Sequence, residues 1–80
     1  MVAPKHKAIQ YENRDAVVNA YNELDKIRAN VKDVEFLIKL FNDFHNNEML
    51  TLRSFSSCGD CRTALKNFFR YVIEEWKKTS

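Results

Sequence analysis

The sequence contains very little glycine and proline, one residue of each among 80. Tight turns between strands depend on these residue types, whereas helices need neither of them. The sequence also lacks any run of 18 apolar residues, so we expect no segment to span a membrane. These absences argue against a β-sheet fold and a membrane protein, and they predict an all-α protein.

Neither sign of charge is in large excess. Thirteen Lys and Arg residues against eleven Asp and Glu give a net charge of +2, which is too small to indicate nucleic-acid binding by itself. The basic residues Lys5, His6 and Lys7 are not followed by an apolar stretch, so we expect no secretory signal. In the cytosol or inside a virion, the two cysteines would stay reduced.

Apolar and aromatic residues are plentiful, with six Phe, three Tyr and one Trp. Large aromatic side chains help a small core to form, and 80 residues have room for one core only. We therefore predict a single helical domain over residues 13–80. Residues 1–12 are predicted to be an extended arm, because Ile9 and Tyr11 are its main apolar anchors.

A heptad of apolar residues begins after Asn13, with spacings that alternate between three and four. This spacing predicts one long helix over residues 14–45. The alternative is a break at Asn30, which would then be the N-cap of a separate helix. We prefer continuity because the heptad passes through Asn30 unshifted, and an Asn30→Ala substitution should then be nearly neutral. The heptad consists of Val17, Ala20, Leu24, Ile27, Val31, Val34, Ile38 and Phe41.

A second amphipathic helix is predicted over residues 58–77. Ser57, followed by Asp60, resembles a capping box at its start. Residues 48–57 are predicted to be either a short helical turn or a brief extended piece. The two helices would fold back on each other as a helical hairpin. The apolar positions of the second helix are Cys61, Leu65, Phe68, Phe69, Val72, Ile73 and Trp76.

The two predicted helices differ in length. A helix of about 30 residues is about 45 Å long, so a returning helix of about 20 residues leaves part of its apolar stripe uncovered. We therefore predict self-association or a protein partner. The alternative is that the stripe serves only the hairpin's own core. The predicted partner contacts are Val17, Tyr21 and Leu24, with Ile9 and Tyr11 of the arm.

A Cys-x-x-Cys motif occupies residues 58–61. A thiolate at a helix N-terminus could support redox catalysis, although thioredoxin-like activity needs a βαβ frame. With His45 or His6, the two thiols could instead bind zinc. The pair could also form a disulfide under oxidising conditions. We prefer the interpretation that Cys58 and Cys61 are packing residues, and we predict no cofactor.

Arg62, Lys66 and Arg70 are spaced four residues apart and are candidate nucleic-acid contacts. Glu74 follows Arg70 by four residues and could pair with it, so we prefer a solvated helix face. The sequence has no glycine-rich phosphate loop, no nucleophile elbow and no paired acid and base. We therefore predict that the protein is not an enzyme.

Three consecutive pieces of residues 36–76 form a pattern: FLIKLFNDFHN, NEMLTLRSF and SSCGDCRTALKNFFRYVIEEW. The pattern resembles short proteins and domain tails of crAss-like tailed phages of gut Bacteroidetes, in which a Cys-x-x-Cys opens a C-terminal helix. The resemblance implies a virion accessory protein that docks on capsid or tail proteins, located in the virion or host cytoplasm. The alternative is a regulatory or anti-defence protein, with or without zinc, that binds nucleic acid or a host factor.

Overall fold

The structure is a computed structural model that describes residues 4–24 and 30–79. Within these ranges the chain forms five α-helices and no strand, which confirms the predicted all-α fold. The helices are α1 (Pro4–Ile9), α2 (Arg14–Leu24), α3 (Val31–His45), α4 (Leu52–Ser57) and α5 (Gly59–Thr79).

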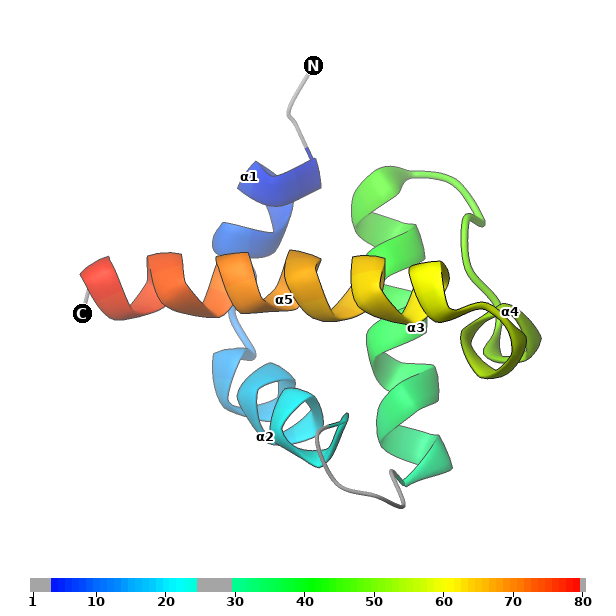
Figure 1. The fold of residues 1–80 in the computed structure, drawn as a ribbon. Coiled ribbons are helices and arrows are strands. Elements are labelled where there is room, and N and C mark those ends of the chain that lie inside the picture. Colours follow the sequence, from blue (N-terminus) through cyan, green and yellow to red (C-terminus); the bar gives the residue numbers. More distant parts are fainter. Residues whose placement is uncertain (1–3, 25–29, 80) are drawn as a thin grey trace.

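Helix α5 is the element around which the other helices are arranged. In Figure 1 it crosses α3, with α1 on one side, α2 on the other, and α4 beside its first turn. It contacts all four of these helices. The longest dimension of the molecule is 33 Å, whereas a continuous helix over residues 14–45 would be about 48 Å long. The protein is therefore a bundle of crossing helices, and the predicted helical hairpin is wrong.

The predicted long helix is two helices. Helix α2 is described as far as Leu24, and Asn30 precedes α3 with an extended backbone (φ −68°, ψ 126°). The Asn30 side-chain oxygen accepts a hydrogen bond from the backbone N–H of Lys32 at 2.9 Å. This bond satisfies an N–H group that has no partner within the helix, which is the function of an N-cap. The heptad position Ile27 lies outside the described residues.

Replacing Asn30 with alanine should lower the free energy of unfolding by about 1 kcal/mol, because alanine cannot accept the N-capping hydrogen bond. Chemical denaturation followed by circular dichroism would measure the change. Asn30→Asp, which keeps an acceptor oxygen, is the control and should stay within a few tenths of a kcal/mol of the parent. A neutral Asn30→Ala variant would instead agree with a continuous helix.

The predicted extended arm contains helix α1, so that prediction is also wrong. Ala8 has no exposed surface, and the Tyr11 ring meets the Phe44 ring edge-on at a centroid distance of 5.7 Å. The indole Nε1 of Trp76 donates a hydrogen bond to the Ile9 carbonyl at 2.8 Å. Six helical residues make fewer than two turns, which is too short for a periodic apolar pattern to appear in the sequence.

Helix α3 ends where the sequence predicted, at His45-Asn46-Asn47. Asn46 has a left-handed backbone (φ 54°, ψ 33°), which asparagine tolerates at a helix C-terminus. A non-helical stretch then leads into α4, whose N-cap Thr51 accepts a hydrogen bond from the Ser54 N–H. Of the two alternatives predicted for residues 48–57, the structure shows the short helical turn. Helix α5 agrees with the predicted helix over 58–77 to within two residues at either end.

Candidate functional site

The partner contacts predicted on α2 lie in the protein's own core. Val17 is fully buried, Leu24 is 6% exposed, and Tyr21 is half-buried against the same core. Helices α3 and α5 both contact α2. Ile9 and Tyr11 also pack partly buried against this core. Val17, Tyr21 and Leu24 are therefore covered by other helices of the same chain, whereas the heptad residue Val31 is 55% exposed.

The predicted basic row is engaged within the chain. The Arg62 guanidinium donates hydrogen bonds to the carbonyls of Phe55 and Ser56 at 3.2 and 3.4 Å. Arg70 lies 3.5 Å from the Glu74 carboxylate, at the predicted four-residue spacing. Lys66 is half-buried and also has an interaction partner. Arg62 and Arg70 nevertheless remain exposed, as on the solvated helix face that the sequence favours.

Cys58 is the single residue between α4 and α5. Its sulfur accepts a hydrogen bond from the Cys61 backbone N–H at 3.3 Å, and its carbonyl accepts one from the Arg62 N–H at 3.2 Å. The capping position predicted for Ser57 therefore belongs to Cys58, because the Ser57 hydroxyl donates to the Arg53 carbonyl at 2.9 Å. Both cysteines are half-buried and free.

The two thiols have different acidities. Hydrogen bonds from the side chain and then the backbone N–H of Cys61 lower the pKa of Cys58 below its ordinary value. The pKa of Cys61 is raised, first by its hydrogen bond to Cys58 and then by partial desolvation. Cys58 is therefore the thiol that ionises first.

The histidines considered as zinc ligands lie in other contacts. The Nδ1 atom of His45 is 2.7 Å from the Phe41 carbonyl oxygen, and the two rings stack at a centroid distance of 4.1 Å. His6 is exposed on α1. Across residues 4–24 and 30–79, no three His, Cys, Asp or Glu side chains are grouped so that they could hold a metal ion. In the same ranges, no helix combines the length and apolar character that a bilayer span requires.

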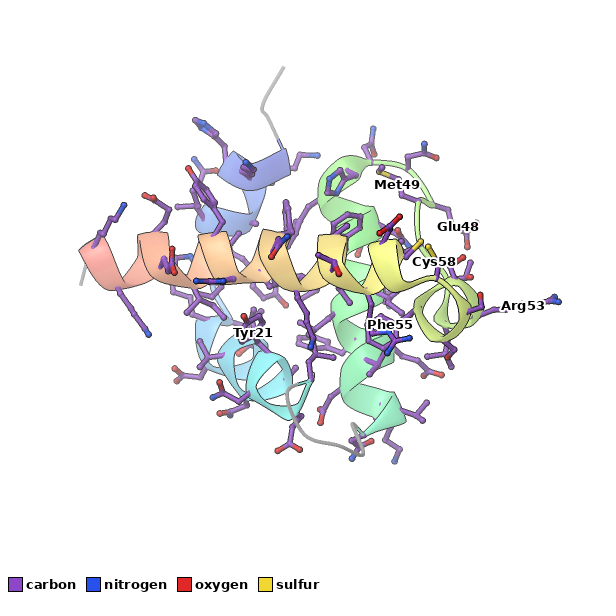
Figure 2. All side chains as sticks on the ribbon, viewed as in Figure 1. Tyr21, Glu48, Met49, Arg53, Phe55 and Cys58 are labelled. Carbon is purple, nitrogen blue, oxygen red and sulfur yellow. The ribbon has the colours of Figure 1, made fainter. Side chains whose placement is uncertain are left out.

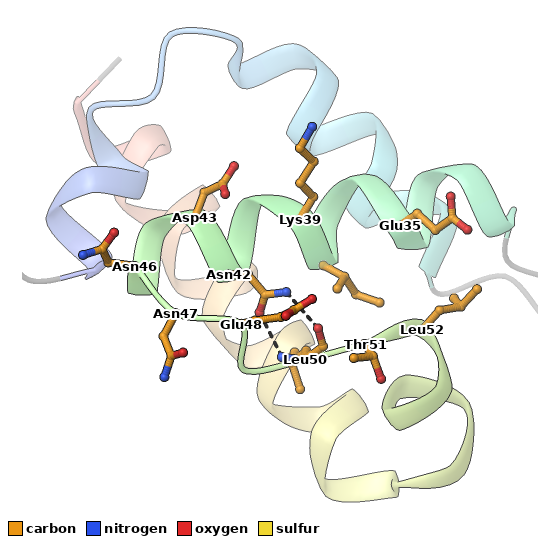
Figure 3. Close-up of a pocket in the computed structure, with 11 residues that line it drawn as sticks. Glu35, Lys39, Asn42, Asp43, Asn46, Asn47, Glu48, Leu50, Thr51 and Leu52 are labelled. Carbon is orange, nitrogen blue, oxygen red and sulfur yellow. Dashed lines mark hydrogen bonds between the residues drawn. The ribbon is translucent and has the colours of Figure 1, made fainter.

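A groove of about 570 Å³ lies between α3 and the segment that follows it (Figure 3). Asn42 joins its two walls. The Asn42 amide nitrogen donates to the Leu50 carbonyl at 2.8 Å, and its oxygen accepts from the N–H groups of Met49 and Leu50, both at 2.9 Å. One side chain therefore satisfies three backbone groups of a non-helical segment. Ile38, Leu50 and Leu52 give the groove its apolar surface.

The groove has an acidic rim. Glu35, Asp43 and Glu48 contribute three carboxylates and Lys39 one ammonium group, a formal charge of 1 − 3 = −2. The whole chain has a net charge of +2, so the groove has the opposite sign to the molecule as a whole. Met49, next to the groove residue Leu50, is 54% exposed. Figure 2 shows Glu48 and Met49 on the segment that forms the outer wall.

Sequence reasoning did not identify this groove. Of the apolar groove residues, Ile38 lies on α3, Leu50 lies between α3 and α4, and Leu52 is the first residue of α4. No single periodic pattern of apolar residues therefore contains all three. The one local signal is Asn42, a polar residue one turn before the end of α3, from which a short amide can reach the returning backbone. Compared with protein-family models, curated proteins and solved structures, the chain matches none of them.

Proposed function

We propose that this chain is a non-enzymatic interaction protein that binds a basic, amphipathic segment of a larger protein in the α3 groove. The observation that supports this function is a partly apolar groove with an acidic rim on a chain of net positive charge. Burial of the partner's apolar side chains would supply affinity. The rim would select a segment of positive charge, because complementary charge determines specificity and speeds association.

The composition of the interior supports binding rather than catalysis. Among the side chains that the structure describes, those that are buried are all apolar. Enzyme sites commonly hold buried acids, bases or nucleophiles whose acidity is adjusted by their surroundings. The groove residues Glu35, Lys39 and Asp43 are exposed instead, where they suit surface recognition.

The resemblance of residues 36–76 to proteins of crAss-like phages favours a capsid or tail protein as the larger partner. In this proposal the chain is a small virion accessory protein. The regulatory alternative has less support, because nucleic-acid binding would use Arg62, Lys66 and Arg70. These side chains already make the contacts within the chain that are described above.

The proposal is tested by titrating the protein, observed by NMR, with a synthetic amphipathic peptide of leucine and lysine. We expect the largest backbone shift changes at Ile38, Asn42 and Leu50. A peptide in which glutamate replaces every lysine should bind at least about tenfold more weakly, because the rim would repel it. Equal binding of both peptides, or shift changes confined to another face, would contradict the proposal.

A charge reversal in the rim provides a second test with a matched control. Asp43→Lys should weaken binding of the basic peptide by about three- to tenfold, as expected when an exposed attraction becomes a repulsion. Glu12→Lys makes the same charge change at an exposed residue that does not line the groove. That control should leave the dissociation constant unchanged to within about twofold.

A further inference from the structure

We propose that Cys58 and Cys61 form a redox-active dithiol that exchanges with small-molecule disulfides, with Cys58 as the attacking residue and Cys61 as the resolving residue. This activity goes beyond the proposed function, since the thiols do not line the α3 groove. It is compatible with the packing of Cys61, which lies partly buried against the core.

The position of Cys58 at the start of a helix is the first part of the argument. Helix α5 has 21 residues, and its first N–H groups lack partners within the helix. One of these groups, that of Cys61, donates to the Cys58 sulfur at 3.3 Å. Such a bond, together with the positive end of the helix dipole, favours a thiolate over a neutral thiol.

The second part is the spacing of the two cysteines. Cys58 immediately precedes the helix and Cys61 lies in its first turn. The Cys58 sulfur lies 3.3 Å from the Cys61 backbone nitrogen, so it faces the first turn of α5. A disulfide requires a Cβ separation of about 3.5–4.5 Å, and Cys58 has a non-helical backbone (φ −119°, ψ 111°) that is not held by the hydrogen bonds of a helix interior. A resolving thiol is thus within reach of the residue that attacks.

The third part of the argument is the access of a small disulfide to the Cys58–Cys61 motif. Gly59 and Asp60, the two residues between the cysteines, are both exposed. A Cβ atom added at Gly59 would meet no atom within 4 Å, so open space lies beside the motif. Figure 2 shows Cys58 at the end of the molecule where α4 meets α5. A small disulfide can therefore approach the motif without displacing another part of the chain.

The acidities of the two thiols agree with these roles. The attacking thiol needs a lowered pKa, and that of Cys58 is lowered chiefly by its hydrogen bonds from Cys61. The carboxylate of Asp60 opposes this effect weakly, as the last of the contributions. Cys61 has a raised pKa and remains a protonated donor until the first exchange has occurred.

Exchange proceeds in two balanced steps. The Cys58 thiolate attacks one sulfur of the small disulfide, the bond between its two sulfurs breaks, and one thiolate leaves. Cys61 then loses its proton to that thiolate or to water and attacks the Cys58 sulfur, which expels the second small thiolate. Two protein thiols are oxidised to one disulfide, and the small disulfide is reduced by two electrons to two thiols.

The test treats the full chain with glutathione disulfide and follows its mass with time. The parent should lose the mass of two hydrogens and retain no glutathione. Cys61→Ser keeps a hydroxyl donor at position 61 but cannot resolve, so it should accumulate one glutathione on Cys58. Cys58→Ser should react at least about fivefold more slowly than Cys61→Ser near neutral pH, because the remaining thiol is the less acidic one.

Gly59→Ala provides a control for damage to the motif. It adds a methyl group in open space, so the helix should be intact by circular dichroism and the exchange rate unchanged within about twofold. Equal rates for the two serine variants would overturn the assignment of roles. A parent that stays reduced, keeps glutathione, or forms a disulfide between two chains would overturn the dithiol itself.

Discussion

Replacing Trp76 with alanine is expected to lower the free energy of unfolding by about 3–5 kcal/mol. The indole is 5% exposed, so its removal leaves a large cavity beneath α1. The substitution also removes the hydrogen bond from Nε1 to the Ile9 carbonyl, which joins residues 67 positions apart. The Arg14 guanidinium, 5.5 Å above the ring, loses its aromatic contact as well. Urea denaturation followed by circular dichroism would measure the loss.

Trp76→Phe separates packing from hydrogen bonding. Phenylalanine keeps most of the apolar contact but cannot donate to the Ile9 carbonyl, so a loss of about 1–2 kcal/mol is expected. In both variants, hydrogen exchange of the α1 amides should accelerate more than that of α3. A Trp76→Ala variant within about 1 kcal/mol of the parent would show that α1 does not depend on this anchor.

The second large effect is expected at Asn42. Asn42→Ala removes three hydrogen bonds to the backbone of Met49 and Leu50. At about 1 kcal/mol for each bond, the free energy of unfolding should fall by about 2–3 kcal/mol. The Met49 and Leu50 amides should also exchange faster, because the outer wall of the groove loses its attachment to α3. Denaturation and amide exchange measure the two effects separately.

Two variants complete this test. Asn42→Asp still accepts from the two N–H groups but cannot donate to the Leu50 carbonyl, so its loss should be smaller than that of alanine. Asp43→Ala changes the exposed neighbour and should alter stability by less than about 0.5 kcal/mol. If Asn42→Ala lowers the free energy of unfolding as little as Asp43→Ala does, water replaces the three hydrogen bonds. Asn42 would then not attach the outer wall of the groove to α3.

The elements that could be predicted from the sequence are those with strong local signals. Helix α5 has a long apolar period and lysines in its last turn. The end of α3 is marked by Asn46, which adopts the left-handed conformation found there. In both cases the information lies within a few residues, and no knowledge of the neighbouring helices is needed.

The break between α2 and α3 could not be predicted from periodicity. Two separate helices that bury one face each show the same three- and four-residue spacing as one continuous helix. Val17 and Leu24 on α2 and Val34 on α3 belong to one core, and the axes of α2 and α3 differ in direction (Figure 1). Only the ability of Asn30 to cap a helix N-terminus distinguishes the two cases. The regular heptad favours the continuous helix, which is the wrong alternative.

The candidate sites were predictable to different extents. The spacing of Cys58 and Cys61 is visible in the sequence, but their opposite pKa shifts depend on which residue precedes α5. A capping position one residue earlier, at Ser57, would leave the Cys58 sulfur without the N–H of Cys61. The groove depends on contacts between Asn42 and Leu50, and a pattern of apolar and charged residues does not specify such a contact.

The central position of α5 has a consequence for how the chain acquires its structure during synthesis. Because α5 contacts all four preceding helices, those helices cannot complete a shared core until α5 has left the ribosome. Until then their apolar faces are available to chaperones or to other chains. Folding should therefore occur after α5 emerges, in a single cooperative step, and a chain arrested before residue 59 should remain sensitive to protease.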